Sequence, residues 1–417
     1  MTKIKPGRLA ELSIAQWQEW IAEHAQHVRS TPYQQEYGNE VRALVREALP
    51  ELTAEADWLF DLNIHLFLLR KQSTSGHSSY AAQIAASETI QEVANHLVHG
   101  STLDIAARQW DRLLETTTYI RETAVTHHWS PTAFLDIYVE LWIQMIAPKA
   151  DGNRIFEEEL ARLNEAEETV LAAEKADSTS LTGSTYGHGP RKTHKLFLLV
   201  ARAWMQLWLV EDRKAWQLLE IAERHQLQPG HVFRFLSVLE EAGEWHRLEA
   251  WLSECATERI GRRPGTLEKY GRYWDAVVER VPEAEDRMWH GIKSQLPYSR
   301  SLYEEKLLHY RRWRQWVDYQ LSVGSDPLDF RVKDLQPIDK EAPEALLPFY
   351  HQGAEKYVLL KNRNGYKRAV KLLKRLAKLY KKLKREERWA AYIETFARRH
   401  SRLRALQEEL RKGKLIP

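Results

Sequence analysis

Asn364-Gly-Tyr-Lys-Arg-Ala-Val-Lys-Leu-Leu-Lys-Arg-Leu-Ala-Lys-Leu-Tyr-Lys-Lys-Leu-Lys-Arg385 is the stretch that decides the fold. It holds ten Lys or Arg and not one Asp or Glu. Its apolar residues recur in alternating steps of four and three, which places them on one face of an α-helix. We therefore predict an amphipathic helix with a strongly basic exposed side, opened by a turn and N-cap at Asn364-Gly365.

A second amphipathic segment follows at once. Apolar residues recur at helical spacing from Trp389 to Leu410, and Glu386 and Glu387 suit the first turn of a helix because carboxylates are favoured at its positive end. Residues 356–417 are thus expected to form a basic C-terminal helical hairpin.

The cations of the first arm fall into two rows. Repulsion between like charges four residues apart costs about 0.2–0.5 kcal/mol a pair in an isolated helix, so a bound anion would offset a real penalty. Phosphates are suitable anions because binding them releases condensed counterions. Lysines outnumber arginines and no aromatic residue lies outside the apolar seam, which favours contact with a phosphate backbone over reading of bases. The candidate nucleic-acid or polyanion-binding residues are Lys367, Lys371, Lys374, Lys378, Lys381 and Arg385 in one row, and Arg368, Arg375 and Lys382 beside it.

Two other interpretations of this basic arm stay open. It could bind a protein partner. It could also be a cap whose lysine stems cover the preceding helices while the ammonium groups face water or the acidic body of the chain.

Charge is distributed very unevenly along the chain. The net charge is only +3, yet residues 356–417 contain 21 Lys or Arg against 5 Asp or Glu. The preceding 355 residues contain 40 basic and 53 acidic side chains. A basic block on an acidic body can meet an external polyanion or dock on its own chain.

The rest of the chain is predicted to be all-α. Helical periodicity recurs from Ile14 onwards, Gly and Pro are sparse, and no stretch alternates with the period of two that a half-buried strand requires. The Ser-, Thr- and Gly-rich residues 177–193 are typical of a flexible linker. We therefore expect a helical bundle over 1–176, helical repeats over 194–355 and the basic hairpin over 356–417.

A weak internal repeat marks the second half of the chain. An apolar residue precedes a Trp by six positions, and another large apolar residue follows that Trp by three. Such a period suggests stacked αα-hairpins similar to tetratricopeptide repeats, although the consensus of that family is absent. An irregular bundle filled by Trp is the alternative. The instances are Val210/Trp216/Leu219, Leu239/Trp245/Leu248, Leu307/Trp313/Trp316 and Leu383/Trp389/Tyr392.

Residues that could carry chemistry are few. His24/His27 and His96/His99 could each share a helix face, but neither pair has further ligands in a known metal motif. Gly183 to Gly189 lacks the Gly-Lys-Ser/Thr ending of a phosphate loop. Cys255, the single cysteine, lies among apolar residues where a buried thiol is expected. We predict no enzyme, no cofactor, no metal site and no small-molecule substrate.

The sequence favours a soluble cytoplasmic protein that does not associate with a membrane. One cysteine excludes an intramolecular disulfide. The first residues lack the apolar core of a signal peptide. The longest apolar run, Leu196 to Val210, is interrupted by Arg202 and Gln206 and is too short to span a bilayer.

The stretch from Asn364 through Trp389, and on from Ser401 to Leu415, resembles the C-terminal end of bacterial SWIM zinc-finger proteins. The resemblance is best over the last 55 or so residues and looser from about residue 195. It implies a long helical region and association with Swi/Snf-type helicase-like ATPases. The zinc module of that family needs a Cys-x-Cys and a Cys-x-His, which this chain, with Cys255 alone, lacks. A separate zinc-finger chain could supply that module.

Together these observations predict a non-catalytic helical scaffold or accessory protein. Its expected partners are nucleic acid, bound through the basic helix, and a helicase-like ATPase. The alternative is a pure protein–protein interaction scaffold of tetratricopeptide-like type that binds no nucleic acid.

Overall fold

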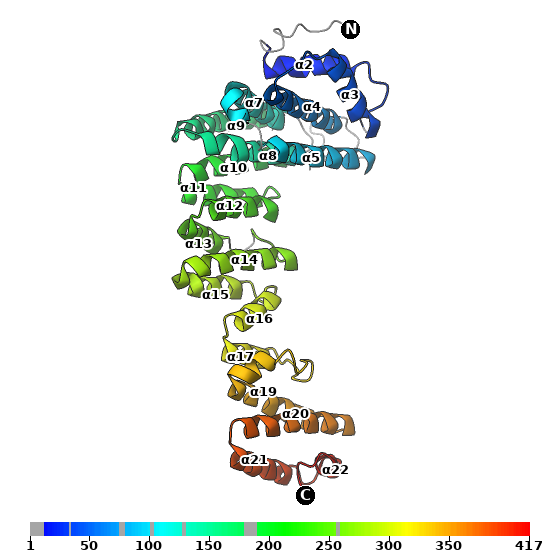
Figure 1. Cartoon of the computed structure of the whole chain (residues 1–417), viewed down its shortest axis with the longest axis vertical. Helices are drawn as coiled ribbons and strands as arrows, with labels where there is room; N and C mark the ends of the chain where they lie inside the picture. Colours follow the sequence, from blue (N-terminus) through cyan, green and yellow to red (C-terminus); the bar gives the residue numbers. More distant parts are fainter. Residues whose placement is uncertain are drawn as a thin grey trace. The chain divides into compact units, whose positions relative to one another are not determined.

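The computed structural model describes residues 12–32, 35–74, 80–100, 104–126, 131–178, 190–255 and 259–417. Over these residues the chain is helical and contains no strand, so the predicted all-α class is confirmed. The chain divides into two compact units: Met1–Gly261 with Arg272–Gly291, and Arg262–Gly271 with Ile292–Pro417. Figure 1 labels most of the helices of both units.

The first unit contains most of the chain's helices. Their bounds are α2 (Ile14–Ala25), α3 (Gln35–Ala48), α4 (Ala54–Thr74), α5 (Tyr80–Gly100), α6 (Ile105–Arg108), α7 (Trp110–Thr126), α8 (Pro131–Leu141), α9 (Arg154–Ser178), α10 (Pro190–Trp208), α11 (Asp212–Glu223), α12 (Pro229–Glu241) and α13 (Trp245–Glu254). Helices α14 (Pro264–Arg280) and α15 (Glu285–Ser294) follow, and each has residues in both units.

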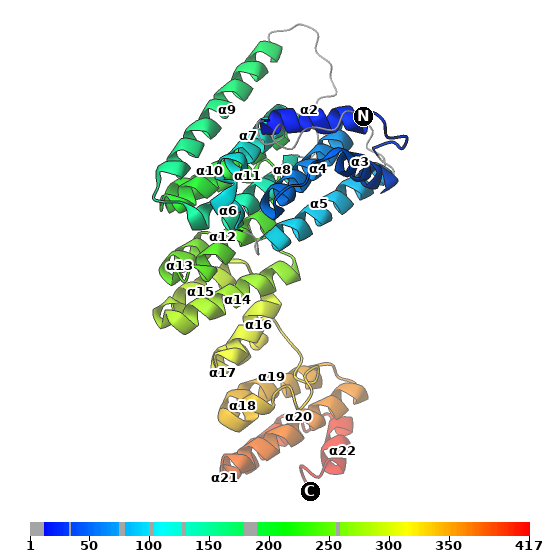
Figure 2. The same ribbon diagram turned by 45° about the horizontal axis from the view of Figure 1, so that its top comes forward.

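The expected boundary at 177–193 does not separate two compact bodies. Helix α9 continues to Ser178, α10 begins at Pro190, and residues 179–189 lie outside the described part of the chain. Helix α10 packs against α8 and α9, which precede that segment, and against α11, which follows it; Figure 2 shows α9 along its length. The reason is that the part of α10 from Leu196 to Leu207 has buried side chains around nearly its whole circumference. Helix α10 therefore needs neighbouring helices from before and after residues 177–193.

The second unit carries the basic end of the chain. Its helices are α16 (Arg300–His309), α17 (Trp313–Ser322), α18 (Gln336–Glu341), α19 (Leu346–Leu359), α20 (Arg363–Lys382), α21 (Glu386–Arg399) and α22 (Arg404–Lys412). In Figures 1 and 2, α20 lies between α19 on one side and α21 with α22 on the other, and α20 contacts all three.

Several helices end in the same way, which explains part of the Trp repeat. A residue with positive φ follows the last turn of the helix, and the backbone N–H of the residue after it donates to the carbonyl five residues earlier. After Gly243, the Glu244 N–H donates to the Leu239 carbonyl. After Arg311, the Arg312 N–H donates to the Leu307 carbonyl. Trp245 and Trp313 then each begin the following helix. These two instances are structurally equivalent. Trp216 and Trp389 do not begin a helix: they are the fifth residue of α11 and the fourth residue of α21.

The basic hairpin differs from its prediction in two details. Asn362, and not Asn364, is the N-cap of α20, because its side-chain oxygen accepts from the Gly365 N–H at 2.7 Å. The second arm is two helices, since the chain turns between Arg399 and Arg404 and α22 folds back onto α20. Among the described residues, no helix combines the length and the apolar character needed to cross a bilayer.

Candidate nucleic-acid interface on helix α20

Helix α20 owes its position to a wide apolar face. Tyr366, Val370, Leu373 and Tyr380 of the predicted seam are buried, and Ala369, Leu372, Leu376 and Leu379 are buried as well. The seam is therefore broader than the sequence pattern suggested, because α20 packs against α19 on one side and against α21 and α22 on the other. Nine Lys or Arg and no Asp or Glu occupy the helix. Because α19, α21 and α22 cover the apolar face of α20, the basic side chains of α20 lie at the edges of that face or on the uncovered side of the helix.

The second row of candidate cations is held by the same unit. Arg368 Nη1 donates to the Tyr357 hydroxyl at 3.2 Å and lies 3.9 Å from the Asp326 carboxylate. Arg375 Nη1 donates to the Pro327 carbonyl at 3.2 Å, and its guanidinium lies 5.7 Å from the centre of the Tyr350 ring. Lys382 Nζ donates to the Asp339 backbone carbonyl at 2.6 Å and to its carboxylate at 3.0 Å. These three residues fasten α20 to the segment before α19.

Tyr357 joins this arrangement from α19. Its hydroxyl donates to the Asp326 carboxylate and accepts from Arg368. Burial, together with this bond to a carboxylate, raises the pKa of Tyr357 to about 12, so the phenol stays protonated and keeps donating. Arg368 is therefore held between the Tyr357 hydroxyl and the Asp326 carboxylate.

The first row is different. The side chains of Lys367, Lys371, Lys374, Lys378, Lys381 and Arg385 are all exposed. None of them forms a hydrogen bond or an ion pair with any side chain in the part of the chain that the structure describes. From Lys367 to Lys381 the row extends about 21 Å along the helix at 1.5 Å per residue. Helix α20 ends at Lys382 and Arg385 is the N-cap of α21, so Arg385 lies beyond the helix and outside the predicted row. We call the five lysines of this first row, from Lys367 to Lys381, the lysine row.

The two ends of α20 are stabilised in different ways. Lys381 and Lys382 lie in the last turn, where a positive charge is favoured by the helix dipole. Arg363 lies in the first turn, where it is disfavoured, but it pairs with Glu408 at 3.3 Å and Glu409 at 3.1 Å on α22. The sequence did not identify this pairing, because it joins residues about 45 positions apart.

A cleft of about 590 Å³ adjoins the lysine row within the second unit. Arg375, Lys378 and Lys382 reach it from α20, and Lys333 and Asp339 reach it from the segment around α18. Lys378 therefore belongs to both features. Sequence reasoning missed Lys333, which lies in an irregular stretch with no periodic signal.

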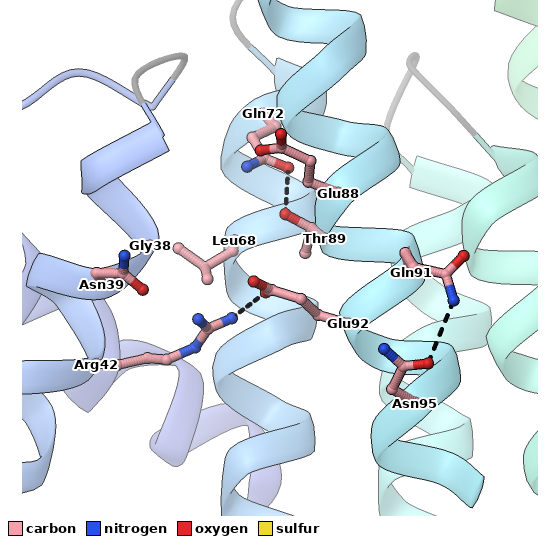
Figure 3. Close-up of a pocket in the computed structure, with 10 residues that line it drawn as sticks. All are labelled: Gly38, Asn39, Arg42, Leu68, Gln72, Glu88, Thr89, Gln91, Glu92 and Asn95. Atoms are coloured by element: carbon pink, nitrogen blue, oxygen red, sulfur yellow. Dashed lines mark hydrogen bonds and ion pairs between the residues drawn. The ribbon is translucent and has the colours of Figure 1, made fainter.

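The first unit contains a polar cavity of about 350 Å³ between α3, α4 and α5. Figure 3 shows that its polar side chains are engaged mainly with each other, and it contains no nucleophile paired with a base. The bonds are an ion pair of Arg42 with Glu92, a donation from Thr89 to Gln72 at 3.2 Å and one from Gln91 to Asn95 at 3.2 Å.

Three of the four histidines noted in the sequence bond to backbone carbonyls, and the cysteine is buried. His24 Nδ1 bonds to the Trp20 carbonyl, and His96 Nε2 to the Trp58 carbonyl, each at 2.8 Å. His99 Nδ1 bonds to the Asn95 carbonyl at 2.7 Å. Within the described ranges no three His, Cys, Asp or Glu side chains converge as metal ligands would. Cys255 is fully buried, as predicted, and burial raises the pKa of its thiol to about 12. Gly183 to Gly189 lies outside the described residues.

Comparison with known proteins yields one curated relative with an uninformative name. The chain is 33% identical over 196 residues to the uncharacterized protein YwqB of Bacillus subtilis, a match that covers 45% of this chain and 36% of that protein. The matched segment thus spans about a third of the relative's length. No family model matches the chain, and no solved structure matches it.

Proposed function

We propose that this protein is a non-catalytic accessory protein that binds nucleic acid through the lysine row of α20. The observation that carries the proposal is that five lysines, from Lys367 to Lys381, line one exposed face of α20, and no carboxylate among the described residues pairs with them. Repulsion between like charges in such a row destabilises the helix. Bound phosphate groups would neutralise these charges, and the binding would release counterions from the nucleic acid.

The composition of the row favours backbone contact without base recognition. Lysine provides a point charge, whereas arginine provides the planar fork that reads guanine. The aromatic side chains of α20, Tyr366 and Tyr380, are buried beneath the row and offer no stacking platform to single-stranded bases. We therefore expect a duplex to bind at least as well as a single strand of the same length.

The resemblance to SWIM proteins supports a more specific setting. Members of that family are associated with helicase-like ATPases, and the lysine row lies in the part of the chain that carries the resemblance. We propose that the protein acts beside such an ATPase, with nucleic acid on α20. We propose that a separate zinc-finger chain supplies the zinc module, since Cys255 alone cannot form it.

A salt series of mobility shifts on a mixed-sequence duplex tests the binding proposal. If all five lysines contact phosphates, the logarithm of the binding constant falls with the logarithm of salt concentration with a slope of about −4.5. Reversing four charges, with Lys371→Glu, Lys374→Glu, Lys378→Glu and Lys381→Glu combined, should weaken binding more than about hundredfold and flatten the slope.

The matched control reverses four exposed charges away from α20: Arg213→Glu, Lys214→Glu, Arg224→Glu and Arg263→Glu. This variant has the same net charge as the first but an intact lysine row, so its binding should stay within about threefold of the unmodified protein. Equal losses in both variants, or binding that does not respond to salt, would refute the proposal.

The alternative is a protein-interaction scaffold, and exposed apolar side chains at the turn between α19 and α20 favour it. Leu359 is 72% and Leu360 55% exposed, and because they are adjacent they form one continuous apolar surface. A scaffold predicts a stoichiometric protein partner in affinity purification that survives nuclease treatment and is lost with Leu359→Ser and Leu360→Ser.

A further inference from the structure

The cleft beside the lysine row contains more positive charge than its surroundings neutralise. Four cations line it: Lys333, Arg375, Lys378 and Lys382. The one lining carboxylate is Asp339, which is bonded to Lys382. The net charge of the lining is therefore about three positive units at neutral pH, since lysine and arginine are fully protonated there.

Two of the cations are fixed in place. Arg375 is held by the Pro327 carbonyl and lies near the face of the Tyr350 ring. The bond to Pro327 and a side-chain hydrogen bond to Tyr350 still leave other N–H donors of its guanidinium for a ligand. Lys382 is held by two oxygens of Asp339. A site whose donors are already ordered binds an anion without ordering them first.

The other two cations are adjustable. Lys333 and Lys378 are exposed, and neither forms an ion pair or a side-chain hydrogen bond with a described residue. The carboxylate of Asp334, the residue next to Lys333, accepts from the Arg331 backbone N–H at 2.9 Å and from the Arg331 guanidinium at 3.3 Å. Both ammonium groups can therefore turn toward a ligand in the cleft.

The floor of the cleft is apolar. Leu335 and Leu379 are buried beneath it, and Val332 lies at its margin with 72% of its surface exposed. The volume of about 590 Å³ falls within the range of small-molecule sites. An extended strand would use only the open edge, whereas a compact, multiply charged group can be surrounded by all four cations.

We propose that this cleft binds a compact polyphosphate group, either as the inorganic chain or as the triphosphate of a nucleotide. Such a group carries three to four negative charges, which match the positive charge of the lining. The site is distinct from the nucleic-acid surface, although Lys378 lies in both, and it does not depend on nucleic-acid binding.

Isothermal titration of the full chain with inorganic tripolyphosphate, metal-free ATP and adenosine tests this site. Tripolyphosphate and ATP should bind, and adenosine should not. Tighter binding of ATP would show that the organic part contacts the apolar floor, and equal affinities would show that the phosphates act alone; both agree with the proposal. Absence of binding by tripolyphosphate would overturn it.

Two substitutions separate the cleft from the lysine row. Lys333→Glu should weaken tripolyphosphate binding about tenfold, as expected for a charge-assisted hydrogen bond, and leave duplex affinity unchanged. The double variant with Lys371→Glu and Lys374→Glu should weaken duplex binding and leave tripolyphosphate affinity unchanged. If the cleft proposal fails, the test of nucleic-acid binding by the lysine row can therefore still be interpreted, and the converse also holds.

A third variant guards against simple loss of folding. Asp339→Asn removes the one carboxylate of the lining but keeps a side-chain oxygen and the backbone carbonyl for Lys382. It should raise tripolyphosphate affinity about fivefold, an increase that misfolding cannot produce. A decrease would contradict the proposal.

Discussion

Arg121 of α7 and Glu159 of α9 form an ion pair whose side chains are only 7% and 2% exposed. Tyr138 of α8 donates its hydroxyl to the same carboxylate at 2.8 Å, and Arg162 approaches its other oxygen at 3.5 Å. Three helices of the first unit thus meet at one buried carboxylate. Burial and the Glu159 charge hold the pKa of Tyr138 well above its usual value, so its proton stays in place.

Arg121→Met should destabilise the first unit by about 3–5 kcal/mol, because it removes the buried cation and leaves the Glu159 carboxylate only the half-exposed Arg162. Urea unfolding and amide exchange in α7, α8 and α9 measure the effect. Adding Glu159→Gln to this variant should recover most of the loss, since a neutral amide oxygen still accepts from Tyr138. A double variant as unstable as the single one would contradict this account.

His65 should make the first unit sensitive to acid. Burial, followed by the nearby charge of Arg42, lowers the pKa of His65 to about 4, while the unfolded chain titrates near 6.5. Below pH 6.5 the unfolded state therefore binds a proton that the native state does not. Stability should fall by about 3 kcal/mol between pH 6.5 and 4 for this reason.

His65→Asn is the variant that tests the His65 prediction. The His65 Nδ1 bonds to the Asp61 carbonyl at 2.7 Å, and an asparagine amide can replace that donor without titrating. The fall in stability over the same pH range should shrink by about 3 kcal/mol. An unchanged pH profile of the unfolding midpoint would show that His65 is not responsible.

Val210→Gly should stabilise the protein by about 1 kcal/mol. Val210 has a φ of 59°, a backbone conformation that is sterically strained for a β-branched residue and unstrained for glycine. Its side chain is 65% exposed, so little packing is lost when it is removed. Val323→Gly is the matched control, since Val323 has φ of −86° and gains no relief from strain. It should lower the thermal midpoint, and a lower midpoint for Val210→Gly as well would refute the strain argument.

Gly365→Ala should destabilise the second unit by about 1–3 kcal/mol although alanine is the better helix former. A Cβ at Gly365 would lie 2.6 Å from the Tyr357 backbone oxygen, so α20 could not stay docked on α19. Gly230 in the first turn of α12 has open space around a Cβ, and Gly230→Ala should raise stability slightly. Opposite signs in urea unfolding are the expected result.

Much of the fold follows from local pattern. The alternating steps of three and four from Tyr366 to Tyr380 were enough to predict α20 and its buried face, because helical periodicity depends only on neighbours in sequence. The break at residues 400–403 was not predicted, since Leu403 and Leu406 continue the apolar spacing. The break is a feature of the tertiary structure, in which α22 turns back and contacts α20.

What the sequence alone determined is the class of the fold, the helix that carries the lysine row and the uneven distribution of charge. Only the tertiary structure decided that Arg368, Arg375 and Lys382 are bound by their own unit while the lysine row is open, and that Lys333 meets Lys378 across a cleft. The physical reason is that spacing along one helix fixes which side chains share a face. Which of those faces is then covered depends on segments 40 or more residues away, such as Asp326, Pro327 and Asp339.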